Sequence, residues 1–297
     1  MIEPGSTYVV MGLLNTDSIA YAAGKMLTEM GGNVIYTVQS ERMKRIFFDR
    51  SPDLTQEEKD AMRFEYCDVT VENEVRNLFA KTGPINGVLH SIGFANPKTC
   101  LGDSMYTSAY EDIKQAFHIS CASLSTVSHF ALEQMEKGGS IVTLSFESQL
   151  AFPYYNWMGV NKAALEALVR ALAREYGREH VRVNAISAGP LATKAAKSIP
   201  HFAHLAKTWR QISPLPWDVV NDKAEVANAV VFMLGKYSKK ITGQTIYVDG
   251  GANNMGGMLL PREKPLKSSP AKRAAKKKQE AQERLERMRA LQKSQKQ

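Results

Sequence analysis

A short apolar run that ends at a glycine and leads into a helix-like segment is the feature that most constrains the fold of this chain. Residues 8–11 have the composition of a buried strand, Gly12 follows them, and residues 19–24 are compatible with a helix. A strand, a glycine turn and a helix start form the unit with which α/β folds bind pyrophosphate, because the free N–H groups of the helix face the anion. Since the full GxGxxG fingerprint is absent, this segment alone indicates an α/β fold and names no ligand.

Six further apolar runs have the length and composition of strands, and several are separated by segments compatible with helices. The runs cover residues 33–38, 64–67, 87–90, 140–144, 181–186 and 243–251, and the longer helical segments cover 71–80, 110–134 and 224–234. Alternating strands and helices are typical of a parallel sheet covered on both faces. The sequence therefore predicts an α/β fold in a single domain, a Rossmann-type doubly wound seven-stranded parallel sheet.

The positive charge of the chain is concentrated at one end. The formal net charge is +8, but residues 261–297 hold eight Lys and five Arg against four Glu, which leaves 25 basic and 26 acidic side chains in residues 1–260. A nucleic-acid-binding fold carries its basic patch on the fold itself, so no nucleic acid partner is expected. We predict a domain over residues 1–260 and a basic tail over 261–297, helical or disordered, which could contact acidic surfaces.

The sequence also indicates the cellular compartment. No run of 18 apolar residues is present, and the first residues lack the basic and apolar regions of a signal peptide. The cysteines at positions 67, 100 and 121 are far apart, without metal or redox spacing. These observations predict a cytoplasmic protein with reduced thiols, no transmembrane segment and no metal site.

Tyr155 and Lys162 form a candidate catalytic pair. They are seven residues apart in a helix-compatible region, so they are expected on one helix face. A nearby ammonium favours the ionised phenol, which predicts a lowered pKa for Tyr155. Such a pair can donate a hydrogen bond or a proton to an oxygen that gains charge. The alternative is an interfacial tyrosine and a surface lysine at this spacing by chance.

The segment from Tyr155 to Lys162, YNWMGVNK, resembles the short-chain dehydrogenase/reductase superfamily and, within it, the bacterial enoyl-acyl-carrier-protein reductases. Most of the superfamily carries Tyr-x3-Lys, but the residue four before Lys162 is Met158, and the enoyl reductases carry Tyr-x6-Lys instead. Further matches are HSIG at 90–93, SAGP at 187–190 and GQTIYVDGG at 243–251. The resemblance covers residues 8–257 and implies the strand order 3-2-1-4-5-6-7.

The resemblance also implies where a nicotinamide dinucleotide binds. Lys162 would hold the nicotinamide ribose, and the remaining cofactor positions are Gly12, Ser18, Ile19, Gln39, Asp68, Val69, Ser91, Ile92, Gly93, Ile186 and Thr193. Gln39 and Ser40 supply no cation for a 2′-phosphate, so NADH is favoured over NADPH. Basic residues at positions 42, 44 and 45 keep NADPH open as the alternative. Ser18 could equally serve only as a helix N-cap.

For the substrate, the resemblance implies a mobile lid over about residues 194–217 and contacts from Phe146, Met158, Phe202 and Leu205. Many bacterial enoyl reductases carry a second tyrosine where this chain has Phe146. Relatives also place basic residues beside the Phe202 position to dock the acidic carrier protein, but here Pro200, Ala203 and His204 stand there. Three other basic residues could replace them: Lys197, Lys207 and Arg210.

The implied activity is reduction of trans-2-enoyl thioesters on acyl carrier protein in fatty-acid elongation, by an oxidoreductase that forms a homotetramer. Two alternatives stay open. One is a carbonyl or alcohol oxidoreductase of the same superfamily, and the other is a binding protein on a retained reductase fold. His90 is expected to be structural, because the hydride mechanism needs no general base.

Overall fold

The computed structural model describes residues 1–259. Residues Met1–Gly257 form one compact unit. The basic tail predicted from residue 261 lies outside the described residues. None of the helices in the described part of the chain is long and apolar enough to cross a membrane.

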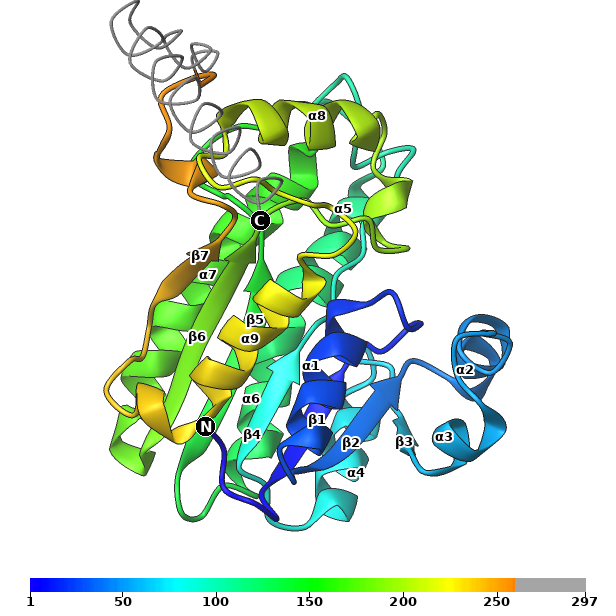
Figure 1. The fold of residues 1–297 in the computed structure, drawn as a ribbon, viewed down its shortest axis with the longest axis vertical. Helices are drawn as coiled ribbons and strands as arrows, with labels where there is room; N and C mark the ends of the chain where they lie inside the picture. Colours follow the sequence, from blue (N-terminus) through cyan, green and yellow to red (C-terminus); the bar gives the residue numbers. More distant parts are fainter. Residues whose placement is uncertain (260–297) are drawn as a thin grey trace, which may run out of the picture. The chain divides into compact units, whose positions relative to one another are not determined.

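Seven parallel strands form one sheet in the order β3-β2-β1-β4-β5-β6-β7 (Figure 1), which confirms the order that the resemblance implied. The strands are β1 (Thr7–Met11), β2 (Asn33–Val38), β3 (Arg63–Tyr66), β4 (Gly87–His90), β5 (Gly139–Ser145), β6 (Val181–Ala188) and β7 (Thr245–Val248). The order reverses between β1 and β4, and open α/β sheets bind ligands outside the carboxyl ends of the strands at such a point.

Helices cover both faces of the sheet. One face is covered by α1 (Ile19–Glu29) and α9 (Lys223–Leu234), and the other by α4 (Glu72–Thr82), α6 (Ser123–Leu132) and α7 (Asn156–Tyr176). In β1, Tyr8 and Val10 pack on the first side, whereas Val9 and Met11 pack on the second. Because both faces are buried, Tyr8–Met11 are all hydrophobic instead of alternating with polar residues.

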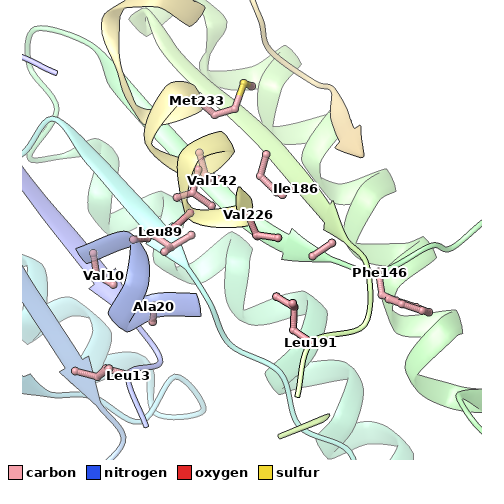
Figure 2. Close-up of a cluster of buried hydrophobic side chains, with 14 of the residues drawn as sticks. Val10, Leu13, Ala20, Leu89, Val142, Phe146, Ile186, Leu191, Val226 and Met233 are labelled. Carbon is pink, nitrogen blue, oxygen red and sulfur yellow. The ribbon is translucent and has the colours of Figure 1, made fainter. Parts of the chain in front are cut away.

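The core on the α1 and α9 side continues to the carboxyl ends of the strands. Figure 2 shows strand side chains beneath α1 and α9, with the cluster extending to two residues beyond β5 and β6. Its labelled members are Val10, Leu13, Ala20, Leu89, Val142, Phe146, Ile186, Leu191, Val226 and Met233. The hydrophobic core therefore supports the end of the sheet at which the predicted site residues gather.

A π turn interrupts the helix expected over residues 110–134. The observed elements are α5 (Tyr110–Phe117), a π-helical turn (His118–Ala122) and α6. Within the turn, the buried Ser120 hydroxyl accepts a hydrogen bond from Phe94 N and donates one to Phe94 O, both at 2.8 Å. Single π turns often occur at functional sites, and this one fixes the loop that follows β4.

The remaining helices are short or lie at the edge of the unit. They are α2 (Glu41–Phe47), α3 (Gln56–Asp60) and α8 (Phe202–Ile212). Neither α2 nor α3 contains a fully buried residue. The helix α8 lies within the segment that the resemblance identifies as a lid.

Replacing Gly12 by alanine should destabilise the fold. Gly12 has a φ of +82°, and a Cβ there would overlap the carbonyl oxygen of Ser91. Left-handed strain and overpacking together should lower the free energy of unfolding by about 2–5 kcal/mol, measured by urea titration. Gly177→Ala is the control, because Gly177 has a φ of −59° and open space around it. Equal urea midpoints for the two variants would show that the close approach is unimportant.

Candidate active site

Most of the residues predicted to bind a cofactor lie in the loops that follow β1, β2, β3, β4 and β6, whereas Ile19 lies in α1, Lys162 in α7 and Ile186 within β6. At the phosphate end, Gly12 follows β1 and packs on Ser91, which follows β4. Ser18 is the N-cap of α1: its hydroxyl accepts from Tyr21 N at 3.1 Å and donates to Asn15 O at 2.8 Å. Ile19 is the first residue of α1. Ser18 is thus a helix cap, and the first N–H groups of α1 face the position where an anion would bind.

The residues predicted to bind the adenosine lie in the loops after β2 and β3. Gln39 Nε2 donates to Asp68 Oδ2 at 2.8 Å, and Asp68 Oδ1 accepts from the Thr70 N–H and hydroxyl at 2.9 and 2.7 Å. Burial acts to raise the pKa of Asp68, but the hydrogen bonds from Thr70 and Gln39 outweigh it and hold the pKa below its usual value. This hydrogen bond brings two predicted residues, Gln39 and Asp68, together, and the Asp68 carboxylate is ionised. Val69, the next predicted residue, is buried.

Of the three basic residues near this end, Lys44 is committed to other contacts. Its Nζ lies 2.6 Å from Asp49 Oδ1 and 4.7 Å from the centre of the Phe64 ring. Arg42 and Arg45 are exposed on α2. Lys44 therefore contributes little positive charge beside Gln39.

Some of the residues predicted to lie near the nicotinamide are close to Lys162. Ile92 and Gly93 follow Ser91 after β4, and a Cβ on Gly93 would lie only 3.8 Å from Lys162 Nζ. Ile186 is fully buried in β6. Thr193, in the loop after β6, accepts from Ala196 N through its hydroxyl at 3.2 Å. The absence of a side chain at Gly93 lets the backbone after β4 come close to the ammonium of Lys162.

Lys162 is a buried cation at the carboxyl end of β5. Its side chain is 7% exposed, and Nζ donates to the carbonyl oxygen of Leu144 at 2.8 Å. Burial lowers the pKa of Lys162 to about 8, while Cys121 and Glu166 act in the opposite direction. The ammonium form persists at neutral pH.

Glu166 lies one helical turn after Lys162, and the sequence analysis did not identify it. Its carboxylate is buried and accepts hydrogen bonds from Ser145 Oγ at 2.6 Å and Ser148 Oγ at 2.8 Å. Glu166 therefore connects α7 to the loop that carries Phe146. The i,i+4 spacing from Lys162 was the available signal for it.

Tyr155 is the N-cap residue of α7 and is buried. The expected lowering of its pKa was wrong: burial raises the pKa of the Tyr155 phenol, and Lys162 is not among the causes of the shift. Desolvation of the ionised form therefore exceeds the effect of the ammonium. The Tyr155 hydroxyl is a protonated donor at neutral pH.

The backbone around Tyr155 is strained and held by a neighbouring loop. Tyr154 and Asn156 have φ values of 67° and 23°. Asn156 Nδ2 donates to Gly102 O at 2.7 Å and to Ser104 O at 2.8 Å, and Gly102 N donates to Tyr154 O at 3.1 Å. Strain of this kind persists only where surrounding contacts determine the conformation. The loop at 102–104 thus fixes the position of Tyr155.

An aromatic cluster surrounds the Tyr155 ring. The Phe146 ring centre lies 4.8 Å from that of Tyr155, 5.3 Å from that of Phe152 and 5.4 Å from that of Trp209. Trp209, on α8, is 1% exposed and donates from Nε1 to Asp249 O at 2.8 Å. Trp209 lies within the predicted lid range of 194–217 but was not among the predicted site residues, because sequence position alone does not show which lid residue turns inward.

The four predicted substrate residues differ in where they lie. Phe146 and Met158 are buried in the core cluster beside Tyr155, and the half-buried Leu205 of α8 packs against this cluster. Phe202, the first residue of α8, is half-buried but does not pack against it. Three of the four therefore belong to or pack against one hydrophobic cluster, and Phe202 does not.

His90 has a structural role, as expected. It is fully buried, with Nδ1 at 3.0 Å from Thr143 Oγ1 and Nε2 at 2.9 Å from Ser123 Oγ. Burial lowers the pKa of His90 to about 3, so the imidazole is neutral. It connects β4 to β5 and α6.

The comparisons with known proteins agree with this geometry. The family described as Enoyl-(Acyl carrier protein) reductase matches residues 12–253. The chain is 36% identical to the NADH-dependent enoyl-acyl-carrier-protein reductase of Bacillus subtilis over 83% of this chain and 95% of that protein. It is 38% identical to the NADPH-dependent enzyme of Staphylococcus aureus over 82% and 95%.

A solved structure gives the same result. The enoyl-acyl-carrier-protein reductase of Anaplasma phagocytophilum, in complex with NAD, superimposes with a TM-score of 0.78 at 32% identity, covering 86% of this chain and 97% of that one. From the family match, the identity over most of its length and the shared architecture, this chain belongs to the enoyl-acyl-carrier-protein reductase family.

Proposed function

We propose that this protein reduces trans-2-enoyl thioesters on acyl carrier protein, using NADH. The observation that carries the proposal is the burial of the Tyr155 ring in an apolar cluster, together with the burial of the Lys162 ammonium against Leu144 O near the carboxyl end of β5. A buried donor and a buried cation at the carboxyl edge of a Rossmann-type sheet suit a reaction in which an oxygen gains charge.

The residues present fit a dinucleotide. The start of α1 can bind the pyrophosphate, Gln39 and Asp68 can bind the adenosine, and the backbone at Gly93 lies close to Lys162. The bound cofactor supplies a hydride to the β carbon of the substrate. Lys162 holds the nicotinamide ribose hydroxyls through its ammonium, which Leu144 O orients.

Tyr155 acts on the thioester oxygen. As the β carbon accepts the hydride, this oxygen becomes an enolate oxygen, and the Tyr155 hydroxyl donates a hydrogen bond to it. Because burial raises the pKa of Tyr155, the phenol keeps its proton over the whole neutral range. Phe146, which replaces the second tyrosine of many relatives, packs on Tyr155 and cannot donate a proton.

The apolar surface near Tyr155 supports an acyl substrate. Met158 and Leu205 extend the surface that Phe146 begins, and Trp209 closes it from α8. For an acyl chain to enter, α8 has to move, so we propose that residues 194–217 form a lid. Opening and closing of such loops commonly accompany turnover.

Both alternatives have less support. A carbonyl reductase of the superfamily needs a tyrosine where Met158 stands, and Met158 is a buried thioether that cannot donate a proton. A binding protein would have no need to retain the buried Lys162 and Glu166, since buried charges are costly to keep.

The partners of the enzyme include an acyl carrier protein. On α8 and just before it, Lys197, Lys207 and Arg210 are exposed and can attract an acidic partner. The basic tail adds long-range attraction to an acidic partner in this proposal. The test is to compare KM for a carrier-linked substrate between the full-length protein and a variant without residues 261–297, at low and at high salt. A homotetramer, to be tested by light scattering, and a cytoplasmic location, to be tested by cell fractionation, stay predictions.

Replacing Tyr155 by phenylalanine should lower kcat for a crotonyl thioester on the order of 10²–10³, because one transition-state donor is lost. Tyr154→Phe is the matched control, since it removes the neighbouring hydroxyl and should leave kcat within about twofold. Stopped-flow NADH oxidation measures both. Normal turnover by Tyr155→Phe, or faster reduction of a 3-ketoacyl thioester than of the enoyl thioester by the wild-type enzyme, would contradict the assignment.

Replacing Glu166 by glutamine should shift the pH dependence of kcat/KM. The ammonium of Lys162 is required, so activity falls as pH rises through its pKa of about 8. Glu166 and Cys121 both raise that pKa. Losing the carboxylate should therefore move the high-pH limb down by about half a unit or more. Glu175→Gln, on the same helix but exposed, is the control. An unmoved limb in Glu166→Gln would contradict the coupling.

NADH should give the higher kcat/KM in steady-state comparison with NADPH. Gln39 is uncharged and donates to Asp68, and the Lys44 ammonium is paired with Asp49. Neither side chain therefore offers a free cation where a 2′-phosphate would lie. Gln39→Arg should improve the use of NADPH by about tenfold through a charge-assisted hydrogen bond, with Lys98→Arg as the control. A preference of the wild-type enzyme for NADPH would show that exposed Arg42 or Arg45 reaches the phosphate.

A further inference from the structure

A cavity of about 390 Å³ lies at the amino edge of the sheet, the edge opposite to Tyr155. Its walls come from the starts of β1, β5 and β6, from the turn after α7 and from the segment after α9. It is lined by Ile2, Glu3, Ser6, Tyr8, Asn86, Lys137, Gly138, Gly139, His180, Arg182, Leu234, Gly235, Lys236, Lys239 and Lys240. The N-terminus lies beside the segment after α9 (Figure 1), where Lys236 N donates to Met1 O at 3.1 Å.

The cavity is strongly cationic. Five of its lining side chains are basic, namely Lys137, Arg182, Lys236, Lys239 and Lys240, and Glu3 is the single carboxylate among them. Within residues 1–259, none of the five forms an ion pair with a carboxylate. Since residues 1–260 are close to neutral as a whole, this positive cluster is a local feature of the fold.

Arg182 fixes the inner wall. Its Nη1 donates to Met233 O and Ser238 Oγ, both at 2.8 Å, and Nη2 donates to Gly235 O at 3.1 Å. These bonds cap the carboxyl end of α9, a usual site for a cation. They occupy three of the five donors of a guanidinium, so a rigid, half-buried charge with donors to spare faces the cavity.

The capping role explains Arg182 but not the four lysines. Lys137, Lys236, Lys239 and Lys240 are all exposed, and they come from two separate segments of the chain. The wall between these segments is tightly packed, since a Cβ on Gly138 would lie 2.8 Å from His180 O. Tyr8, Ile2 and Leu234 supply an apolar floor.

We propose that this cavity is a second binding site, separate from the active site, for a small molecule that carries a phosphate group. Arginine and lysine together are suited to phosphate, the first through its planar fork and the second as a point charge. The volume is that of a small-molecule site and not of a macromolecular interface. A soluble phosphorylated metabolite and the headgroup of an anionic lipid share this chemistry.

The test is calorimetric titration of the full-length protein with inorganic pyrophosphate, with saturating NADH present to fill the dinucleotide crevice. Wild-type protein should bind with saturation. The double variant Lys239→Glu/Lys240→Glu should bind on the order of tenfold or more weakly, because two charge-assisted contacts become repulsive. Lys98→Glu/Lys114→Glu is the control, since it changes the net charge equally at exposed positions elsewhere. All three proteins keep the basic tail, so its contribution to anion binding is the same in each.

The absence of saturable binding to the wild-type protein, or an equal loss in both double variants, would overturn the proposal. Wild-type affinity of Lys239→Glu/Lys240→Glu for NADH in the same calorimeter would show an intact dinucleotide crevice, a control that does not depend on turnover of the enoyl thioester.

Sedimentation with phosphatidylglycerol vesicles, against phosphatidylcholine vesicles, identifies the source of the phosphate. Selective loss of vesicle binding in the Lys239→Glu/Lys240→Glu variant assigns a lipid headgroup. Equal vesicle binding by all three proteins, together with weakened pyrophosphate binding by that variant, assigns a soluble ligand.

Discussion

The burial of the Lys162 ammonium at the end of β5 is the interaction on which the rest of the site depends. A buried cation needs an acceptor and a counter-charge. Leu144 O supplies the first, and Glu166 contributes attraction from the next turn of α7. Glu166 also accepts hydrogen bonds from Ser145 and Ser148. The carboxylate that stabilises the buried ammonium therefore also holds the loop that carries Phe146.

The strands of the sheet could be predicted from the sequence, because they follow from local signals, whereas the cofactor positions came from the family resemblance. An apolar run and a glycine mark each of β1 and β4, and their carboxyl ends must meet at one edge of a parallel sheet. Ser18 caps α1 for the reason that any serine at a helix start does. The strand order, by contrast, came from family resemblance, since nothing local in an apolar run specifies its neighbour.

The features that could not be predicted from the sequence all depend on contacts between residues that are distant in the sequence. Burial raises the pKa of Tyr155, and the Phe146 ring that packs on it is itself packed against Phe152 and Trp209 from other segments of the chain. A spacing of seven residues shows that Tyr155 and Lys162 can share a face, but not how much water is excluded there. The π turn at 118–122 likewise holds the loop after β4, and the loop at 102–104 holds the backbone beside Tyr155, and both partners are distant in the sequence.

The same topology explains the chemistry at both edges of the sheet. In a parallel α/β unit the helix amino ends gather at the carboxyl edge, where their partial positive charge attracts an anionic cofactor. The helix carboxyl ends gather at the opposite edge, where cations such as Arg182 satisfy the free carbonyls of α9. When more cations accumulate there than the carbonyls require, as with Lys137, Lys239 and Lys240, the surplus charge makes this second edge attractive to anions too.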